Sequence, residues 1–380
     1  MKYLIYRSFN DMKKDEIIPR ALDIAAENNI SGELHKIYTA YMLINDENLF
    51  SLRCEKGDMP DGSLAAIAEE DIMNILADFY YTDDEKYFRA PKGDMTETGK
   101  AVCALMEEIR QGNELHAVAE IYKKYGAGML GMNKVFYLNE NGLLKAVADF
   151  DSVTFDDLWG YDLQKERLIS NTEKFLNGAA ANNVLLYGDS GTGKSTCIKA
   201  LLNKFYGDGL RIVEVSKHQF KYLKELTGQL RKRNYHFIIY MDDLSFEDFE
   251  TEYKYLKSVM EGGMGEKAKN VLIYATSNRR HLVKESWQDR NDMDSELHRS
   301  DTMQEKLSLA DRFGLAISFT KPMQNEYYDI VRHLAKLENI DINDEELIAG
   351  ARRWELTRGG MSGRCARQYI NHILGEKQFE

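Results

Sequence analysis

The sequence predicts an α/β fold in which a parallel sheet carries helices on both faces, between a mainly helical N-terminal domain and a small helical C-terminal lid. The main observation is that short apolar runs alternate with longer amphipathic stretches from Asp151 onward. The apolar runs are residues 183–187, 210–215, 237–241, 271–275 and 315–319. Strands that alternate with helices favour a parallel sheet, because each helix crosses a face of the sheet to reach the next strand. We therefore predict that residues 151–320 form the α/β domain.

The first third of the chain has a different, mostly helical pattern. Apolar residues recur at helical spacing in residues 11–28, 64–80, 101–110 and 115–125. Two apolar runs then flank a turn with the sequence NENG at 139–142, which indicates a β-hairpin. We assign residues 1–150 to a mainly helical N-terminal domain that ends in this hairpin.

Helical spacing returns after Pro322. Residues 324–337, 344–354 and 362–374 each repeat apolar side chains at the helical period. No strand pattern interrupts them. We predict that residues 321–380 form a small, all-helical lid.

The composition is that of a globular protein, with 43% hydrophobic and 29% charged residues. No stretch approaches the roughly 20 apolar residues of a spanning helix, so we expect no membrane association and a cytoplasmic location. The four cysteines lie far apart, at Cys54, Cys103, Cys197 and Cys365. Their spacing argues against structural zinc and against a disulfide framework.

The charge of the chain is unevenly distributed. The formal net charge is −12. Residues 1–150 hold 17 Lys and Arg against 26 Asp and Glu, which is a balance of −9. An acidic domain is a poor general partner for nucleic acid, although a local basic patch could still bind it. The acidic surface can equally serve only solvation.

The sequence GDSGTGKS at 188–195 is the clearest functional motif of the chain. It fits the pattern G-x-x-x-x-G-K-[ST] between an apolar run and a helix-forming stretch, 196–205, as a phosphate-binding loop requires. The glycines let backbone N–H groups point at phosphate oxygens, at the positive end of the following helix. Lys194 is expected to reach the β- and γ-phosphates, and the Ser195 hydroxyl to bind Mg²⁺. The expected contacts to the nucleotide are Gly188, Asp189, Ser190, Gly191, Thr192, Gly193, Lys194, Ser195 and Thr196.

Polar residues follow the next two apolar runs. Asp242 and Asp243 end the run at 237–241, and Asn278 follows the run at 271–275. A phosphate loop needs acidic groups nearby to hold the metal and to position water. We predict that Asp242 holds Mg²⁺ through water, that Asp243 polarises the attacking water and that Asn278 orients it.

An arginine precedes the last strand, and with it the order of parts resembles the AAA+ ATPases over roughly residues 152–375. The sequence LSLADRFG at 307–314 contains Arg312. The resemblance implies that Arg312 projects into the ATP of a neighbouring subunit and stabilises the transferring phosphoryl group. An ion pair within the chain, with Asp311 or a lid carboxylate, is the alternative.

Two further segments fit the resemblance. The sequence FDDLWGYD at 155–162 is similar to the superfamily's adenine-side segment, which implies that Gly160 and Tyr161 flank the base. In the lid, SGRCARQ begins a helix in the manner of the superfamily's second sensor. This implies that Arg364 contacts the γ-phosphate, with Arg367 as the alternative. The pair can also be a surface ion-pair stripe.

Together, the segments DDLSFE, ATSNRRH, LSLADRFG and SGRxARQ resemble those of a bacterial AAA+ family of unknown function, related to replication initiators and loaders. The resemblance implies ATP and Mg²⁺ as ligands, a homo-oligomer built as a ring or a helical assembly, and an unknown protein or nucleic-acid target. Most AAA+ enzymes have Glu where this chain has Asp243. Initiator-like proteins share the Asp and use ATP as a slow switch.

Three functions are compatible with the sequence. The first is an ATPase that remodels or loads a macromolecule. The second is a slow assembly switch or scaffold, and the third is a P-loop kinase for a small substrate, which would leave the sensor and the arginine finger without a purpose. Residues 288–305 are either a target-contacting loop or a solvated insertion, and residues 261–266 are either a pore-facing loop or a simple turn.

Overall fold

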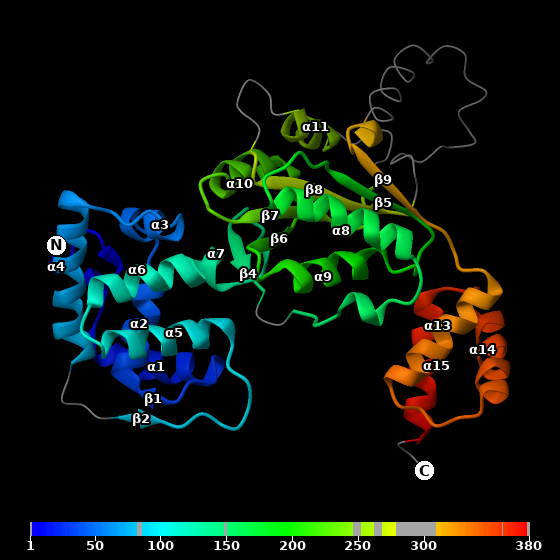
Figure 1. The fold of residues 1–380 in the computed structure, drawn as a ribbon, viewed down its shortest axis with the longest axis horizontal. Coiled ribbons are helices and arrows are strands. Elements are labelled where there is room, and N and C mark those ends of the chain that lie inside the picture. The colour runs from blue at the N-terminus through cyan, green and yellow to red at the C-terminus, as the bar shows by residue number, and fades with distance from the viewer. Residues whose placement is uncertain are drawn as a thin grey trace. The chain divides into compact units, whose positions relative to one another are not determined.

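The computed structural model describes residues 2–81, 86–147, 150–245, 252–261, 268–278, 309–358 and 360–377 (Figure 1). The chain folds into two compact units, Met1–Lys134 and Val135–Glu380. The predicted segments 288–305 and 262–266 lie outside the described residues. Among the helices that are described, none combines the length and the apolar character needed to cross a bilayer.

The N-terminal unit is mainly helical, as the sequence predicts. Its α-helices are α1 (Lys14–Glu27), α2 (Leu34–Asn45), α3 (Leu49–Glu55), α4 (Gly62–Ile75), α5 (Glu97–Ile109), α6 (Glu114–Tyr125) and α7 (Gly128–Met132). The 3₁₀ helix η1 (Arg7–Asp11) and the π-helical segment η2 (Leu76–Tyr80) are shorter. Two short strands, β1 (Gly32–Glu33) and β2 (Tyr87–Phe88), pair antiparallel. Asp71 of α4 is buried and accepts hydrogen bonds from the backbone N–H groups of Leu4, Ile5 and Tyr6 at 2.6–3.2 Å. These bonds attach the first residues of the unit to its helical core.

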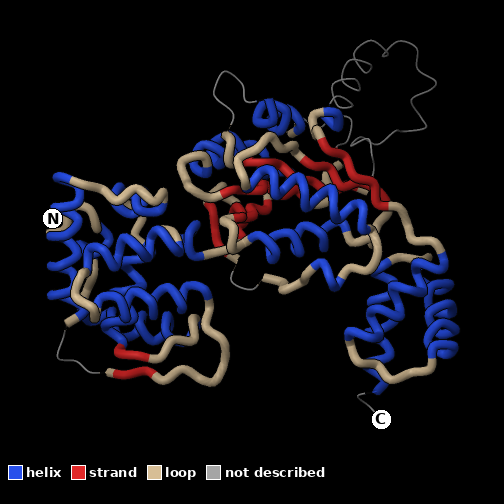
Figure 2. Tube along the Cα trace, in the orientation of Figure 1, coloured by secondary structure: helices blue, strands red, loops and turns tan. Residues whose placement is uncertain are grey.

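The second unit contains a seven-stranded sheet in the order β4-β3-β6-β7-β8-β5-β9. The strands are β3 (Val135–Leu138), β4 (Leu144–Ala146), β5 (Val184–Gly188), β6 (Leu210–Glu214), β7 (His236–Met241), β8 (Val271–Ser277) and β9 (Leu315–Phe319). All neighbouring pairs are parallel except β3 with β4. Figure 2 shows the strands, in red, gathered into this sheet. The predicted parallel α/β sheet is confirmed.

Helices cover both faces of the sheet (Figure 1). On one face lie α8 (Asp162–Leu176) and α9 (Lys194–Phe205), whose apolar residues share a core with alternate residues of the strands. On the other lie η4 (Lys217–Tyr222), α10 (Leu223–Leu230) and α11 (Tyr253–Glu261). Strands between two helical layers are apolar on both faces, which explains their continuous apolar runs in the sequence.

The hairpin at 135–146 is placed differently from the sequence assignment, which put it in the N-terminal domain. Strand β3 pairs in parallel with β6, with Val135 beside Ile212 and Tyr137 beside Glu214, so the hairpin extends the sheet of the second unit. The boundary between the units therefore falls at 134–135. A hairpin pattern is local, and it carries no information about a partner strand 75 residues further along the chain.

The last three helices have a core of their own. They are α13 (Gln324–Leu337), α14 (Asp344–Arg358) and α15 (Gly363–Lys377). Tyr327, Val331, Ala351, Ala366 and Ile370 are all fully buried among these helices. These helices correspond to the predicted lid, and the chain enters them directly from β9.

Candidate functional site

The loop between β5 and α9 turns sharply at two glycines. Gly188 has a φ of +129°, and a side chain at this position would approach the backbone oxygen of Phe319 to 2.1 Å. Gly193 has a φ of +91° directly before α9 begins at Lys194. Both conformations favour glycine, because a Cβ atom would clash with the backbone. The glycines of the pattern are thus required by the shape of the loop itself.

Lys194 is almost fully buried at the base of this loop, with 7% of its surface exposed. Its Nζ donates hydrogen bonds to the backbone oxygens of Gly188 at 2.8 Å and Asp189 at 2.6 Å, and lies 3.4 Å from Oδ1 of Asn278. Burial lowers the pKa of Lys194 from its usual value, although nearby carboxylates oppose this effect. The ammonium group is therefore held within the loop that is expected to receive phosphates.

Asp242 receives three side-chain hydrogen bonds at one oxygen. Ser195 Oγ donates to Oδ1 of Asp242 at 2.8 Å, Tyr240 at 2.7 Å and Thr276 at 2.5 Å. Partial burial alone would raise the pKa of Asp242, but these hydrogen bonds lower it below its usual value. The carboxylate is therefore ionised at neutral pH, beside the Ser195 hydroxyl.

These two oxygen donors fit a magnesium ion. Mg²⁺ prefers hard oxygen ligands and keeps several of its waters, so one hydroxyl and one carboxylate from the protein are a typical set. Ser195 opens α9, whereas Asp242 follows β7, and the hydrogen bond between them brings the two predicted ligands together. The donor set therefore agrees with the prediction of a magnesium site.

Asp243 is fixed by two neighbours on or beside β8. Asn278 Nδ2 donates to its Oδ1 at 2.7 Å, and its backbone N–H donates to Thr276 Oγ1 at 2.9 Å. The backbone of Asp243 has a φ of +48°, a left-handed conformation that aspartate tolerates better than most residues. The structure thus brings together Asp243 and Asn278, the two residues predicted to position water.

A single cavity of about 620 Å³ joins these groups to the lid. Its polar end is lined by loop residues 190–196, Asp242, Asp243 and Asn278, and the lid contributes Arg364 and Arg367. The backbone N–H of Arg364 donates to the Gly191 oxygen at 3.1 Å. Arg367 instead forms an ion pair with Glu338 at 2.7 Å. Of the two arginines, Arg364 is the one that contacts the phosphate loop.

Of the two predicted adenine-side residues, Tyr161 lines the same cavity and Gly160 does not. Tyr161 has a φ of +57° and follows Gly160, which has a φ of +76°. The Tyr161 ring packs on Phe319 with centroids 5.1 Å apart, and its hydroxyl donates to the Thr320 oxygen at 2.8 Å. Burial raises the pKa of Tyr161 to about 12, so the hydroxyl remains a donor at neutral pH.

The loop is also tied to the start of the lid. Asp189 Oδ2 accepts a hydrogen bond from the backbone N–H of Lys321 at 2.8 Å. Thr192 Oγ1 donates to the backbone oxygen of Asp189 at 2.8 Å. A residue predicted only to touch phosphate therefore also contacts the segment that leads into the lid.

The comparison with known families agrees with the sequence resemblance. Residues 132–377 match the family described as "Protein of unknown function (DUF815)". The chain belongs to the DUF815 family. The match covers the whole cavity described above and excludes nearly all of the N-terminal unit. The predicted resemblance to a family of unknown function is thereby confirmed.

Among solved structures, this DUF815 protein is similar to mutants of RuvB from Thermotoga maritima. One has 16% sequence identity and a TM-score of 0.40, with 59% of this chain and 65% of that chain covered. Another has 12% identity and a TM-score of 0.36, with 58% and 71% covered. The chain thus spans slightly less than two thirds of the first of these proteins. No curated protein matches its sequence.

The predicted arginine finger of the DUF815 protein lies outside the cavity. Arg312 forms an ion pair with Glu261 of α11, with Nη2 at 2.6 Å and Nε at 2.9 Å from Oε1. The alternative predicted from the sequence is an ion pair within the chain with Asp311 or a lid carboxylate, whereas the observed partner belongs to α11. The projection of Arg312 into a neighbouring subunit stays a prediction.

Sequence reasoning missed three side chains of the site. Tyr240 and Thr276 hold Asp242, and Trp159 lines the cavity beside Tyr161. Tyr240 and Thr276 read as ordinary strand residues, because their role depends on β7 and β8 being neighbours. In the sequence, Trp159 stands out only as a tryptophan beside Gly160, an expected contact of the base.

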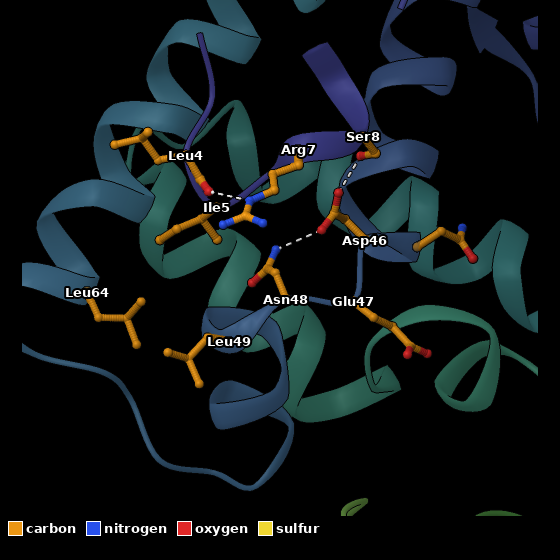
Figure 3. Close-up of a pocket in the computed structure, with 10 residues that line it drawn as sticks. Leu4, Ile5, Arg7, Ser8, Asp46, Glu47, Asn48, Leu49 and Leu64 are labelled. Carbon is orange, nitrogen blue, oxygen red and sulfur yellow. Dashed lines mark hydrogen bonds between the residues drawn. The ribbon is translucent and has the colours of Figure 1, made fainter. Parts of the chain in front are cut away.

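The N-terminal unit contains a second hollow, of about 600 Å³, shown in Figure 3. Leu4, Leu49 and Leu64 contribute its apolar surface. Its polar groups largely bind one another, since Asp46 accepts hydrogen bonds from Ser8 and from Asn48. The lining residues show no arrangement suited to phosphate binding or to acid–base catalysis.

Proposed function

We propose that this DUF815 protein binds Mg·ATP in the cavity between the sheet and the lid, and hydrolyses it to ADP and phosphate. The observation that carries the proposal is the convergence of Lys194, Ser195 and Asp242 at the start of α9, with Ser195 and Asp242 joined by a 2.8 Å hydrogen bond. A helix N-terminus with a lysine and oxygen ligands for Mg²⁺ suits a triphosphate. The chemistry of the cavity supports this ligand.

Each residue has a role that follows from its position. Backbone N–H groups of the loop and Lys194 bind the phosphates, and Ser195 with Asp242 holds the metal, which neutralises charge on the β- and γ-phosphates when it is bound. Asp243 accepts the proton of the attacking water as the bond from the γ-phosphorus to the bridging oxygen breaks. Asn278 keeps Asp243 in place, and Arg364 binds the γ-phosphate from the lid. Catalysis of this kind consists of positioning and charge stabilisation.

We also propose the larger organisation that the sequence suggests. Residues 151–320 bind the nucleotide and residues 321–380 act as the lid. The N-terminal domain recruits or moves a macromolecular target, which is a protein or a nucleic acid. Copies of the chain assemble so that Arg312 of one completes the site of the next. No membrane is involved, and the cytoplasm is the proposed location.

A slow assembly switch is the second candidate function, favoured by the groups around Asp243. Aspartate is one methylene shorter than the glutamate of most AAA+ enzymes, and Asn278 already occupies its Oδ1 at 2.7 Å. A carboxylate held back in this way activates water weakly. In this case ATP drives assembly, and turnover is rare.

The test compares ATP binding and phosphate release for the purified protein and three variants. Lys194→Ala is expected to weaken ATP binding roughly 10- to 100-fold, because it removes a charged hydrogen-bond donor to the phosphates. Asp243→Asn is expected to bind ATP normally and to lose hydrolysis by about 10²-fold or more, because it removes the base. Asp243→Glu is the matched control, and it should keep or increase turnover.

The outcomes separate the candidates. Turnover in the wild type that Asp243→Asn abolishes supports the ATPase, whereas ATP-dependent assembly without turnover supports the switch. Wild-type protein that binds no ATP, or Lys194→Ala that binds it as well as the wild type, overturns both. Phosphate found on an added metabolite, rather than free in solution, would instead indicate a kinase.

A further inference from the structure

Trp159 leaves a large aromatic surface open to the nucleotide cavity. Its side chain lines the cavity, and 48% of its surface is exposed. Exposing a tryptophan side chain costs free energy, because it presents a larger apolar area to water than most side chains do. Leu158, Tyr161, Ile330 and Leu334 line the same cavity. The cavity therefore has apolar surface in addition to the polar phosphate loop.

The indole is supported by His333, which comes from the lid helix α13. The two rings lie with centroids 5.0 Å apart and an angle of 32° between their planes. His333 Nε2 lies 2.7 Å from the backbone oxygen of Asp156, and because a carbonyl only accepts, Nε2 carries the hydrogen. This bond attaches α13 to the short 3₁₀ helix η3 (Phe155–Asp157), which Leu158 separates from Trp159. His333 does not line the cavity, so it contacts Trp159 from outside.

We propose that Trp159 stacks on the base of the bound nucleotide and that His333 is the positioning residue that fixes the indole. This inference rests on the proposed function, because it assigns the base-binding part of the same cavity. A planar base joined to a triphosphate matches a cavity with an aromatic side chain and a phosphate loop. Since the support comes from the lid, base binding and lid position are linked through the two rings.

The test measures the affinity of the full-length protein for two probes, Mg·ATP and magnesium-bound inorganic tripolyphosphate. The second probe has the phosphates of ATP but no base. Trp159→Ala is expected to raise the Kd for ATP about 5- to 150-fold, the range that loss of one base–aromatic stack implies, and to leave the Kd for tripolyphosphate unchanged. Trp159→Phe keeps a ring and should recover most of the ATP affinity.

Tryptophan fluorescence gives a second readout that does not depend on an alanine variant folding. ATP should change the emission of the wild type, tripolyphosphate should change it much less, and Trp159→Phe should remove the ATP response. The matched control is Trp354→Phe, which should keep the response. Trp354 belongs to α14, stacks on His372 at 4.7 Å and does not line the cavity.

His333 is tested by the ratio of the two affinities. His333→Ala should weaken ATP binding by less than Trp159→Ala does, with tripolyphosphate binding unchanged, and His333→Phe should restore it by keeping the stacked ring. Equal loss for both probes, or an ATP-induced emission change that survives in Trp159→Phe, would overturn the inference. Wild-type protein that binds neither probe would instead refute the proposed function itself.

Discussion

At the scale of single residues, the site depends on the hydroxyl of Thr276. It donates to Asp242 at 2.5 Å and accepts from the backbone N–H of Asp243 at 2.9 Å, so one side chain positions both acids. Thr276→Val has nearly the same shape but no hydroxyl. We expect it to weaken Mg·ATP binding roughly fivefold at neutral pH, since a hydrogen bond to an accessible carboxylate contributes about 1 kcal/mol. Thr276→Ser is the control that should retain binding.

The pH dependence of the same variant follows from the direction of the Asp242 pKa. Hydrogen bonds hold this pKa below its usual value, so the proposed metal binding by the carboxylate should persist as the pH falls and be lost only when the pH passes through the depressed pKa. Without Thr276 the pKa rises, and the loss should begin at a higher pH. Titration of Mg²⁺-dependent ATP binding from neutral pH downward checks this. Superimposable profiles for Thr276→Val and the wild type would contradict it.

The contrast between Ser195 and Thr276 shows which residues a sequence can identify. Ser195 belongs to a contiguous pattern whose spacing is set by the loop, so its meeting with Asp242 could be predicted. Thr276 acts through strand pairing, because β7 and β8 are neighbours in register. Nothing in the local sequence marks it as different from other strand residues. The contacts of Arg364 with Gly191 and of Arg367 with Glu338 likewise depend on how the chain packs and are not apparent in the local sequence.

At the scale of elements, a hydrogen bond from the Lys321 backbone N–H to Asp189 joins the phosphate loop to the segment that leads into the lid, and the Arg364 backbone N–H adds a bond to Gly191. We predict that Asp189→Ala lowers the protection of the Lys321 amide against hydrogen exchange roughly fivefold, as loss of about 1 kcal/mol implies. Asp189→Asn keeps an acceptor and should preserve the protection. Tyr161→Phe, which removes a different bond at Thr320, should leave the Lys321 amide unchanged. Equal exchange in Asp189→Ala and the wild type would show that this bond does not protect the Lys321 amide.

The elements themselves were largely predictable, whereas their partners were not. Apolar periodicity located β5 to β9 and the lid helices, because buried strands and amphipathic helices have distinct periods. The hairpin was recognised but assigned to the wrong unit, since its pairing with β6 is non-local. The contact between Trp159 and His333 joins residues 174 positions apart, and only the packing of α13 brings them together.

At the scale of the whole molecule, the proposed assembly requires Arg312 to exchange partners. In the single chain it pairs with Glu261, and the two side chains are 25% and 48% exposed. An ion pair this accessible contributes at most about 1 kcal/mol, so exchanging it for a neighbour's γ-phosphate is inexpensive. An arginine that stabilises a transferring phosphoryl group accelerates related NTPases by about 10³- to 10⁵-fold.

We therefore expect Arg312→Ala to keep its fold and its ATP affinity. It should lose nearly all of the assembly-dependent ATP turnover, which is the part of the rate per chain that rises with protein concentration. Glu261→Gln weakens the ion pair of Arg312 and should leave this turnover equal or higher. Activity measured over a range of protein concentrations, alongside particle mass from light scattering, tests both. Because Arg312 lies outside its own chain's cavity, a loss of activity that is the same at every protein concentration would assign it a role within the single chain. Full activity in Arg312→Ala at every protein concentration would contradict a role of Arg312 in hydrolysis.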